Sequence, residues 1–224
     1  PLHAIAAHYR ACGDFHLGYL FASRACEIPL PEEDDLFVSR GAHSWAATDE
    51  KAICAFYVGR HEESFELSTG LLEGDELPGP ERERVQANRD ICVPGLTGSR
   101  ETYPRELIDE IVGRAGSGGD VTLSITSCRR LPLFERTINA FINCCTDLDR
   151  IGRWICVDNG STTSDRERMK ELYPFLELVP TDPDEGERHA ESMNVIAGLA
   201  ETPLWLHLED DWGFFWRVPY IERA

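Results

Sequence analysis

The sequence predicts an α/β domain with a mostly parallel sheet, preceded by an all-α domain of helical repeats. From residue 121 onward, short apolar runs alternate with helical segments, the order expected of a parallel sheet with helical crossovers. These runs do not alternate polar with apolar residues, as expected when both faces of a sheet are covered. Residues 1–92 instead show helical periodicity. We therefore place the domains at 1–92 and 121–224, with a linker at 93–120.

The first domain is expected to consist of short helices. Leu17, Leu20 and Phe21 recur at helical spacing, and Pro29 ends that segment. The expected helices cover residues 4–11, 17–27, 49–58, 62–72 and 80–92. The linker is rich in Gly and Pro, and it contains one further short helix at about 104–114.

Two helix-turn-helix segments of this domain are similar to each other. Gly13 and Gly59 open the turns, and Tyr19 and Phe65 follow them by six residues. This pattern resembles the tetratricopeptide repeat, and the resemblance implies a surface for a protein partner. The alternative is an ordinary helical bundle. With two copies, we expect a short module rather than a free solenoid.

The second domain is expected to contain four strands and three helices. The strands cover residues 121–126, 154–157, 176–180 and 204–208. The helices cover residues 131–145, 165–173 and 190–200. Each strand is short and apolar, so a sheet buried on both faces is favoured.

The composition excludes some partners. Lys and Arg total 22 against 40 Asp and Glu, a formal charge of -18, so nucleic acid and anionic membranes are repelled. A phosphorylated ligand is also repelled unless a cation intervenes. No run of eighteen apolar residues predicts a membrane span. The 8 cysteines show no CxxC spacing, so we expect reduced thiols in a cytoplasmic protein.

Polar residues follow three of the four expected strands. Residues 126–130 follow the first strand, 158–161 the second and 209–212 the fourth. Ligands of open α/β sheets gather beyond the carboxyl ends of the strands, so these residues are candidates for a site. No GxGxxG or GxxxxGK[ST] sequence follows the first strand, which argues against a dinucleotide-binding domain or a P-loop enzyme.

Four segments together resemble a known family. They are Val121-Thr122-Leu123-Ser124-Ile125-Thr126-Ser127, Ile155-Cys156-Val157-Asp158-Asn159-Gly160-Ser161, Ser192-Met193-Asn194 and His207-Leu208-Glu209-Asp210-Asp211-Trp212. In order and spacing they look like the first half of a GT-A glycosyltransferase of the family-2-like kind, over about residues 121–215. The resemblance implies a Rossmann-like, mostly parallel sheet. It also implies an enzyme that transfers a sugar from a nucleoside diphosphate sugar to an acceptor, either a glycan or a protein.

The resemblance also implies roles for individual residues. The implied donor-binding residues are Thr126, Ser127, Arg129, Asp158, Asn159, Ser192, Asn194 and Asp210. Glu209 and Asp211 match the ends of the family's Asp-x-Asp motif and are the implied ligands of Mn²⁺ or Mg²⁺. The chain departs from the family in two places, because Asn159 stands for a usual Asp and Glu209 replaces the first Asp of the motif.

The acidic motif has a physical interpretation of its own. Carboxylates that face a divalent cation convert repulsion of a diphosphate into a bridge. If the strand continued through the motif, Glu209 and Asp211 would face one way and Asp210 the other. The alternative is a solvated acidic turn. His207 lies within the apolar strand, which favours a hydrogen-bonded core histidine over a ligand.

Two further functions are weighed against sugar transfer. The first is a non-catalytic helical-repeat interaction protein with a degenerate nucleotide-binding half. The second is a nucleotidyltransferase, which would need a glycine-rich basic loop where this chain has Ser127-Cys128-Arg129-Arg130. Because the chain begins at Pro1 and stops at Ala224 soon after the acidic motif, we expect a fragment, and we nominate no catalytic base.

Overall fold

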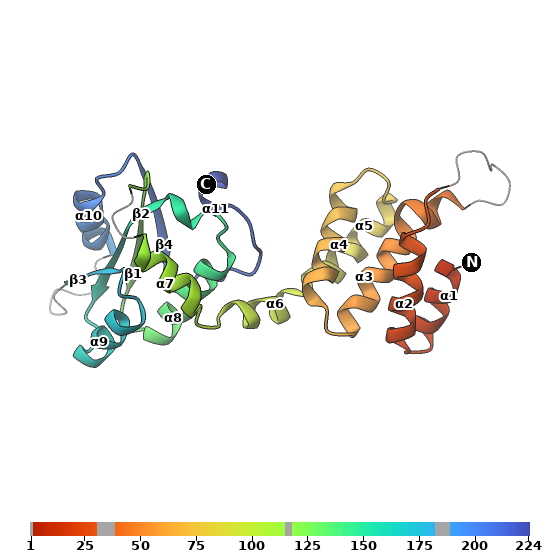
Figure 1. Cartoon of the computed structure of the whole chain (residues 1–224), viewed down its shortest axis with the longest axis horizontal. Helices are drawn as coiled ribbons and strands as arrows, with labels where there is room; N and C mark the ends of the chain where they lie inside the picture. The colour runs from red at the N-terminus through yellow and green to blue at the C-terminus, as the bar shows by residue number, and fades with distance from the viewer. Residues whose placement is uncertain (1, 31–38, 115–117, 182–188) are drawn as a thin grey trace. The chain divides into compact units, whose positions relative to one another are not determined.

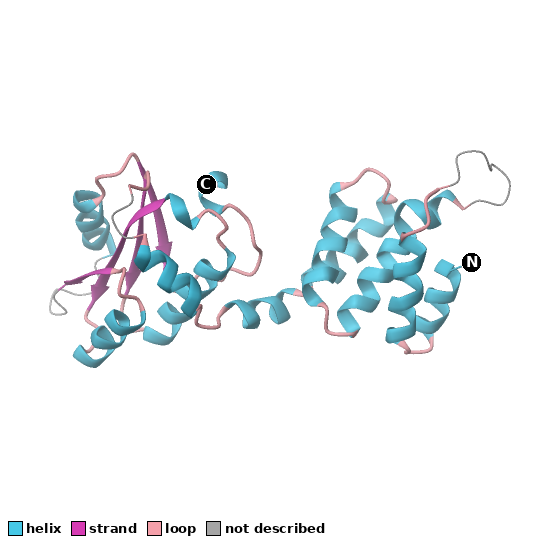
Figure 2. Ribbon diagram, viewed as in Figure 1, coloured by secondary structure: helices cyan, strands magenta, loops and turns pink. Residues whose placement is uncertain are grey.

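The computed structural model describes residues 2–30, 39–114, 118–181 and 189–224 and divides into two compact units, Pro1–Leu96 and Thr97–Ala224. Helices make up the first unit, and the strands lie in the second, as Figure 2 shows. The chain is therefore a mixed α/β protein, as predicted. In the described residues, no helix has both the length and the apolar character needed to cross a membrane.

The first unit contains five α-helices in its described part, labelled in Figure 1. They are α1 (Leu2–Ala11), α2 (Phe15–Cys26), α3 (Ala47–Tyr57), α4 (His61–Glu73) and α5 (Gly79–Asp90). Each predicted helix is present, with ends that differ by no more than about two residues. A short π-helical turn, η1 (Ala42–Ala46), precedes α3 and was not predicted.

The α1–α2 and α3–α4 hairpins share the same turn geometry. Gly13 and Gly59 both adopt left-handed backbone conformations, with φ of 79° and 81°, which glycine tolerates without strain. In both turns, the amide after the glycine donates to the carbonyl five residues earlier, at 2.9 and 2.8 Å. These bonds satisfy carbonyls that the end of each first helix would otherwise leave unpaired.

The helix crossings in the two hairpins also correspond. A Cβ on Gly18 of α2 would lie 2.8 Å from Cys54 Sγ and 3.4 Å from the carbonyl oxygen of Ala6. Ser64 takes the equivalent place on α4, where its hydroxyl donates to the carbonyl of Ala52 at 2.8 Å. Small residues therefore allow the close approach of helices in both hairpins.

The range 93–120, predicted as a linker with one helix, contains two helices in its described part. These are α6 (Val93–Arg100), which the boundary between the two units divides, and α7 (Arg105–Gly113). Ile108 and Ile111 of α7 lie in the core of the second unit. This helix is therefore part of the α/β fold rather than of a linker.

The second unit is built on a parallel sheet. Its strands are β1 (Val121–Ser127), β2 (Ile151–Asn159), β3 (Glu177–Thr181) and β4 (Leu204–Glu209), in the order β3-β2-β1-β4. The helices that follow them are α8 (Leu131–Cys144), α9 (Thr163–Leu172), α10 (His189–Leu199) and the short α11 (Tyr220–Arg223). A single 3₁₀ turn, η2 (Leu148–Arg150), leads into β2.

Helices cover both faces of this sheet (Figure 1). On one face, Leu123 and Trp154 pack with Phe134 of α8 and Met169 of α9. On the other face, apolar residues of β2 and β3 pack against Ile196 of α10. The inner strands β1 and β2 are thus buried on two sides, which explains why they lack a polar alternation. The edge strand β4, expected to be covered in the same way, leaves Leu204 and Trp205 exposed.

Gly119 has a structural role just before β1. A Cβ at Gly119 would lie 2.3 Å from the carbonyl oxygen of Arg150, and one at Gly152 would lie 2.7 Å from the carbonyl oxygen of Gly119. The two backbones meet where β1 and β2 begin, so both positions need glycine. This close backbone contact lies at the end of the sheet opposite to the candidate site.

Candidate functional site

A pocket of about 330 Å³ lies at the carboxyl ends of the strands. Residues from the ends of β1, β2 and β4 and from α10 line it. They are Thr126, Ser127, Cys128, Arg130, Asn159, Ser192 and Glu209.

The topology explains the position of the pocket. From β1 the chain proceeds to β2 and β3, and it then returns to place β4 on the other side of β1. The helix after β1 and the helix before β4 cover opposite faces of the sheet. This arrangement leaves a crevice between the ends of β1 and β4, where ligands of open α/β sheets bind.

Glu209 is held on the β4 side of this pocket by side chains of the same sheet face. The Thr126 hydroxyl donates to Glu209 Oε2 at 2.7 Å, and His207 Nε2 lies 3.3 Å from Oε1. His207 Nδ1 is 2.8 Å from the Ser124 hydroxyl, which also accepts from Trp205 Nε1 at 2.6 Å. His207 is hydrogen-bonded through both ring nitrogens, as expected, and it links Glu209 to Ser124.

Asp210 has a different environment. Its side chain is 0% exposed, and it pairs with Arg130. The backbone amide of Cys128 donates to Asp210 Oδ2 at 3.4 Å, and the Thr137 hydroxyl donates to the Asp210 carbonyl at 2.9 Å. Burial raises the pKa of Asp210 above its ordinary value, and the charge of Arg130 opposes that rise. Asp210 therefore anchors the turn after β4 to α8.

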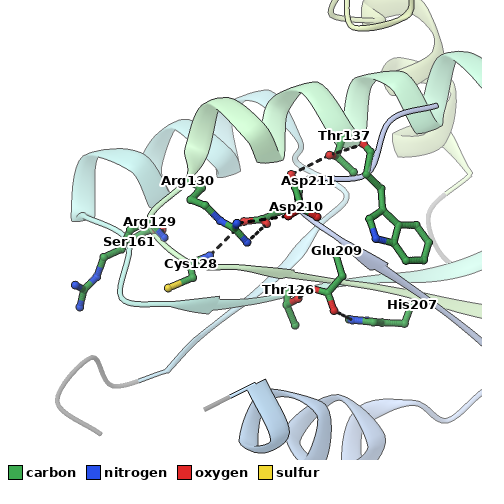
Figure 3. Close-up of polar contacts among 11 residues, drawn as sticks. Thr126, Cys128, Arg129, Arg130, Thr137, Ser161, His207, Glu209, Asp210 and Asp211 are labelled. Atoms are coloured by element: carbon green, nitrogen blue, oxygen red, sulfur yellow. Dashed lines mark hydrogen bonds and ion pairs between the residues drawn. The ribbon is translucent and has the colours of Figure 1, made fainter. Parts of the chain in front are cut away.

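The expected alternation along the acidic motif does not extend beyond Glu209. β4 ends at this residue, and Asp210 and Asp211 lie in the turn that follows. Arg130 Nη1 lies 3.6 Å from Asp211 Oδ2, so the same guanidinium meets both aspartates, as Figure 3 shows. Glu209 and Asp211 thus have different partners, and only Glu209 lines the pocket.

Of the two arginines after β1, the structure places Arg130 in the pocket. Arg129 has a left-handed backbone, with φ of 55°, and its side chain points away from the acidic motif (Figure 3). Its Nε donates to the carbonyl of Gly160 at 3.1 Å. Arg129 was predicted as a donor contact but does not line the pocket, whereas Arg130, the next residue, does line it. The left-handed turn aims consecutive side chains in different directions, and no sequence signal marked it.

Ser127 is the lining residue with an unsatisfied group. Its side chain is almost fully buried, and its hydroxyl has no hydrogen-bond partner among the described residues. A buried hydroxyl without a partner is costly, typically by about 1–3 kcal/mol. The hydroxyl oxygen has almost no surface open to solvent, so a ligand in the pocket reaches it only after a small shift of the wall.

Asp158 and Asn159 separate at the end of β2. Asp158 is fully buried, and its Oδ2 accepts from Arg166 Nε at 2.6 Å. Its Oδ1 is buried and has no partner within the described part of the chain. Asn159 lines the pocket, while Asp158 is absent from the lining residues. Asp158 is thus not among the residues that line the pocket, and its carboxylate, implied to contact the donor, is bound by Arg166 instead.

Of the two donor-binding residues predicted on α10, Ser192 and Asn194, only the first lines the pocket. Ser192 is buried and lines the pocket, whereas Asn194 is exposed and does not. One helical turn holds three to four residues, so side chains two positions apart point to different sides.

The acidic side chains do not form a cation site in their present arrangement. Glu209 has hydrogen-bond partners at both oxygens, and Asp210 is tied to Arg130 and to the Cys128 amide. Asp211 is 53% exposed and faces the same arginine. Over the ranges that the structure describes, no three His, Cys, Asp or Glu side chains are grouped as a metal site. Arg130 therefore pairs with Asp211, one of the two implied ligands of Mn²⁺ or Mg²⁺, and with Asp210 between them.

The first unit contains a larger groove of about 900 Å³. Two buried acids of α3 form part of its wall, and each is paired with an arginine of a neighbouring helix. Glu50 binds Arg10 of α1 through two bonds of 2.5 and 3.0 Å, and Asp49 binds Arg84 of α5 through bonds of 2.9 and 3.2 Å. These ion pairs join α1, α3 and α5 along the groove.

Comparisons with known proteins give no relative. No protein-family model matches the chain, and no curated protein or solved structure matches it either. The pocket is therefore the basis for assigning a function.

Proposed function

We propose that the pocket between β1 and β4 binds a nucleoside diphosphate sugar, and that the protein transfers the sugar to a glycan or protein acceptor. The observation that carries the proposal is the content of the pocket wall, where the guanidinium of Arg130 and the carboxylate of Glu209 line one pocket with Ser127. A cationic group suits the diphosphate, and acceptor oxygens suit the hydroxyl groups of ribose and sugar.

The place of the pocket in the fold supports the same ligand. The sheet is parallel, and the pocket lies at the crevice where nucleotides bind in such folds. The order of the motifs along the chain resembles a GT-A glycosyltransferase, and that resemblance is the basis for sugar transfer rather than another reaction. The fold alone does not distinguish sugar transfer from other reactions of nucleotides.

Calorimetric titration tests the donor. We expect UDP or GDP to bind the full chain and Glu209→Ala to weaken the binding at least about tenfold, because a carboxylate contact to a hydroxyl is lost. Glu201→Ala is the matched control, since Glu201 precedes β4 but its side chain is 84% exposed. Repeating both titrations with Mn²⁺ shows what a cation adds. Equal affinity in the two variants would contradict the proposal.

Sugar transfer itself needs a separate assay. Incubation with a panel of UDP- and GDP-sugars should release the nucleoside diphosphate as water, in place of the acceptor, receives the sugar. Glu209→Ala should slow this release relative to Glu201→Ala. Binding without release for every donor would support a nucleotide-binding protein that does not catalyse transfer.

A second candidate function is a protein-interaction module. The groove of the first unit favours it, because the exposed aromatic side chain of Tyr57 lines the same groove as the two arginine–acid pairs. The shared register of the two hairpins supports the tetratricopeptide-like interpretation. If no nucleotide or nucleotide sugar binds the chain, with or without a cation, this function becomes the better proposal.

A further inference from the structure

The pocket has two charged side chains that are fixed in different ways. Among the described residues that line it, Arg130 carries the positive charge and Glu209 the negative charge. Glu209 is held by Thr126 and His207 within the sheet. Arg130 is held by Asp210 in the turn after β4. Both charged side chains therefore have fixed positions before a ligand binds.

Arg130 is held in place by its ion pair with the buried carboxylate of Asp210. The Asp210 side chain is 0% exposed, and an ionised carboxylate is stable there only with a charged or hydrogen-bonding partner. Arg130 is the charged partner, beside the Cys128 amide, and 46% of the Arg130 side chain remains exposed. A guanidinium has five N–H donors, more than the pair with Asp210 uses. Nη1 also lies 3.6 Å from Asp211 Oδ2, and the donors that face neither aspartate are available to a ligand.

The surroundings of Arg130 favour an anion. Asp211 is more than half exposed, so water and salt screen its charge. Arg130 is also the residue from which α8 starts, and the N-terminal end of a helix of this length adds a partial positive charge. The Ser127 hydroxyl, unpartnered among the described residues, lies in the same wall.

We infer that Arg130 binds the diphosphate of the ligand and that this binding needs no divalent cation. The inference rests on the proposed function, because it takes a nucleoside diphosphate as the ligand. It assigns Asp210 to the support of Arg130 rather than to direct contact with a donor or a metal. The acidic motif then divides into Glu209 at the pocket and Asp210 behind it.

NMR titrations of the full chain with UDP and with uridine, in the presence of a chelator, separate the contacts to the diphosphate from those to the nucleoside. Arg130→Gln should weaken UDP binding by about 10- to 100-fold, since hydrogen bonds between charged groups are lost, and uridine binding by less than about 2-fold. Arg129→Gln is the matched control and should leave both affinities unchanged, because Arg129 points away. With Mn²⁺ in place of the chelator, UDP affinity measured by calorimetry should change by less than about 3-fold, as expected for a contact that an arginine makes without a metal.

A second pair of variants controls for folding. Arg130→Gln together with Asp210→Asn leaves no buried charge unpaired and should show the same selective loss of UDP binding. Arg130→Lys should restore part of the loss, because it keeps the charge. Equal losses for UDP and uridine, or UDP binding that requires Mn²⁺, would overturn the inference. Failure of both UDP and uridine to bind the wild-type chain, with and without Mn²⁺, would instead contradict the proposed function.

Discussion

Ser127 and Ser124 lie on the same strand but have opposite hydrogen-bonding states. Ser124 is bonded to His207 and Trp205, whereas the Ser127 hydroxyl is buried without a partner among the described residues. Ser127→Ala should therefore raise the free energy of unfolding of the ligand-free chain by about 1 kcal/mol. It should also weaken nucleoside diphosphate binding by about 2- to 10-fold. Chemical denaturation and calorimetry measure the two effects.

Ser124→Ala is the control for this prediction. It leaves the indole N–H of Trp205 and a nitrogen of His207 without the Ser124 partner, so it should lower the free energy of unfolding by about 1–3 kcal/mol. If the two substitutions change the free energy of unfolding in opposite directions, the result would support a Ser127 hydroxyl kept unpaired for a ligand. A stability loss of similar size in both would show that Ser127 is an ordinary core residue.

Cys54 gives a pH prediction for the first unit. Burial raises the pKa of its thiol to about 11, from an ordinary value of 9.0. Above pH 9 the unfolded chain loses this proton while the folded chain keeps it, so stability falls as pH rises from 9 to 11. Wild type should lose about 1 kcal/mol more than Cys54→Ala between pH 8 and pH 10. Denaturation curves at the two pH values test this, and equal losses would contradict it.

The candidate site could be predicted from the sequence only in part. Polar residues after apolar runs indicated the strand ends, and Thr126, Ser127, Asn159, Ser192 and Glu209 do line the pocket. The choice between Arg129 and Arg130 depends on one left-handed residue, which the sequence does not mark. The direction of Asp210 depends on where β4 stops, and strand ends are set by tertiary contacts.

At the scale of elements, Gly18 controls how closely α2 approaches its neighbours. A methyl group there would lie 2.8 Å from Cys54 Sγ. Gly18→Ala should therefore lower the free energy of unfolding of the first unit by about 1–3 kcal/mol through overpacking. Adding Cys54→Ala removes the contacting sulfur and should recover part of the loss, in a double-mutant cycle measured by denaturation.

Gly70 provides the matched control on α4. Apart from the backbone of its own helix, no atom would lie within 4 Å of a Cβ there, and the residue is exposed in a regular helix. Gly70→Ala should stabilise the unit by about 0.5–1 kcal/mol, because alanine has the higher helix propensity. If Gly18→Ala were neutral or stabilising like Gly70→Ala, the close crossing would be contradicted.

Most helices and strands follow from the periodicity of the sequence, and α6 shows where this fails. Its sequence contains Pro94, Gly95 and Gly98, which favour a loop. In the structure a Cβ on Gly95 would lie 2.6 Å from the His61 ring, so the glycine permits a close tertiary contact. Packing rather than propensity accounts for this helix. The parallel order β3-β2-β1-β4 likewise needed the structure, because strand sequences do not state their neighbours.

At the scale of the whole molecule, the two units have separate cores. Leu71, Leu77 and Val85 form a cluster in the first unit, and the cluster around Leu123 and Phe141 belongs to the second. A ligand that binds only the folded second unit stabilises that unit, by about 2.7 kcal/mol at a concentration about 100 times its Kd. Hydrogen exchange measured peptide by peptide should show slower exchange with UDP or GDP across β1 and β4. Peptides from α1 to α5 should not change, and uniform slowing would contradict a site in one unit.

The alkylation rate of Cys128 tests the central claim most directly. Cys128 is partly exposed and lines the pocket, whereas Cys12 and Cys26 are exposed on the first unit. With iodoacetamide and peptide-resolved mass spectrometry, UDP or GDP should slow alkylation of Cys128 at least about tenfold when the nucleotide is well above its Kd. The rates at Cys12 and Cys26 should stay the same. Unchanged alkylation of Cys128 at saturating nucleotide would contradict a nucleoside diphosphate site between β1 and β4.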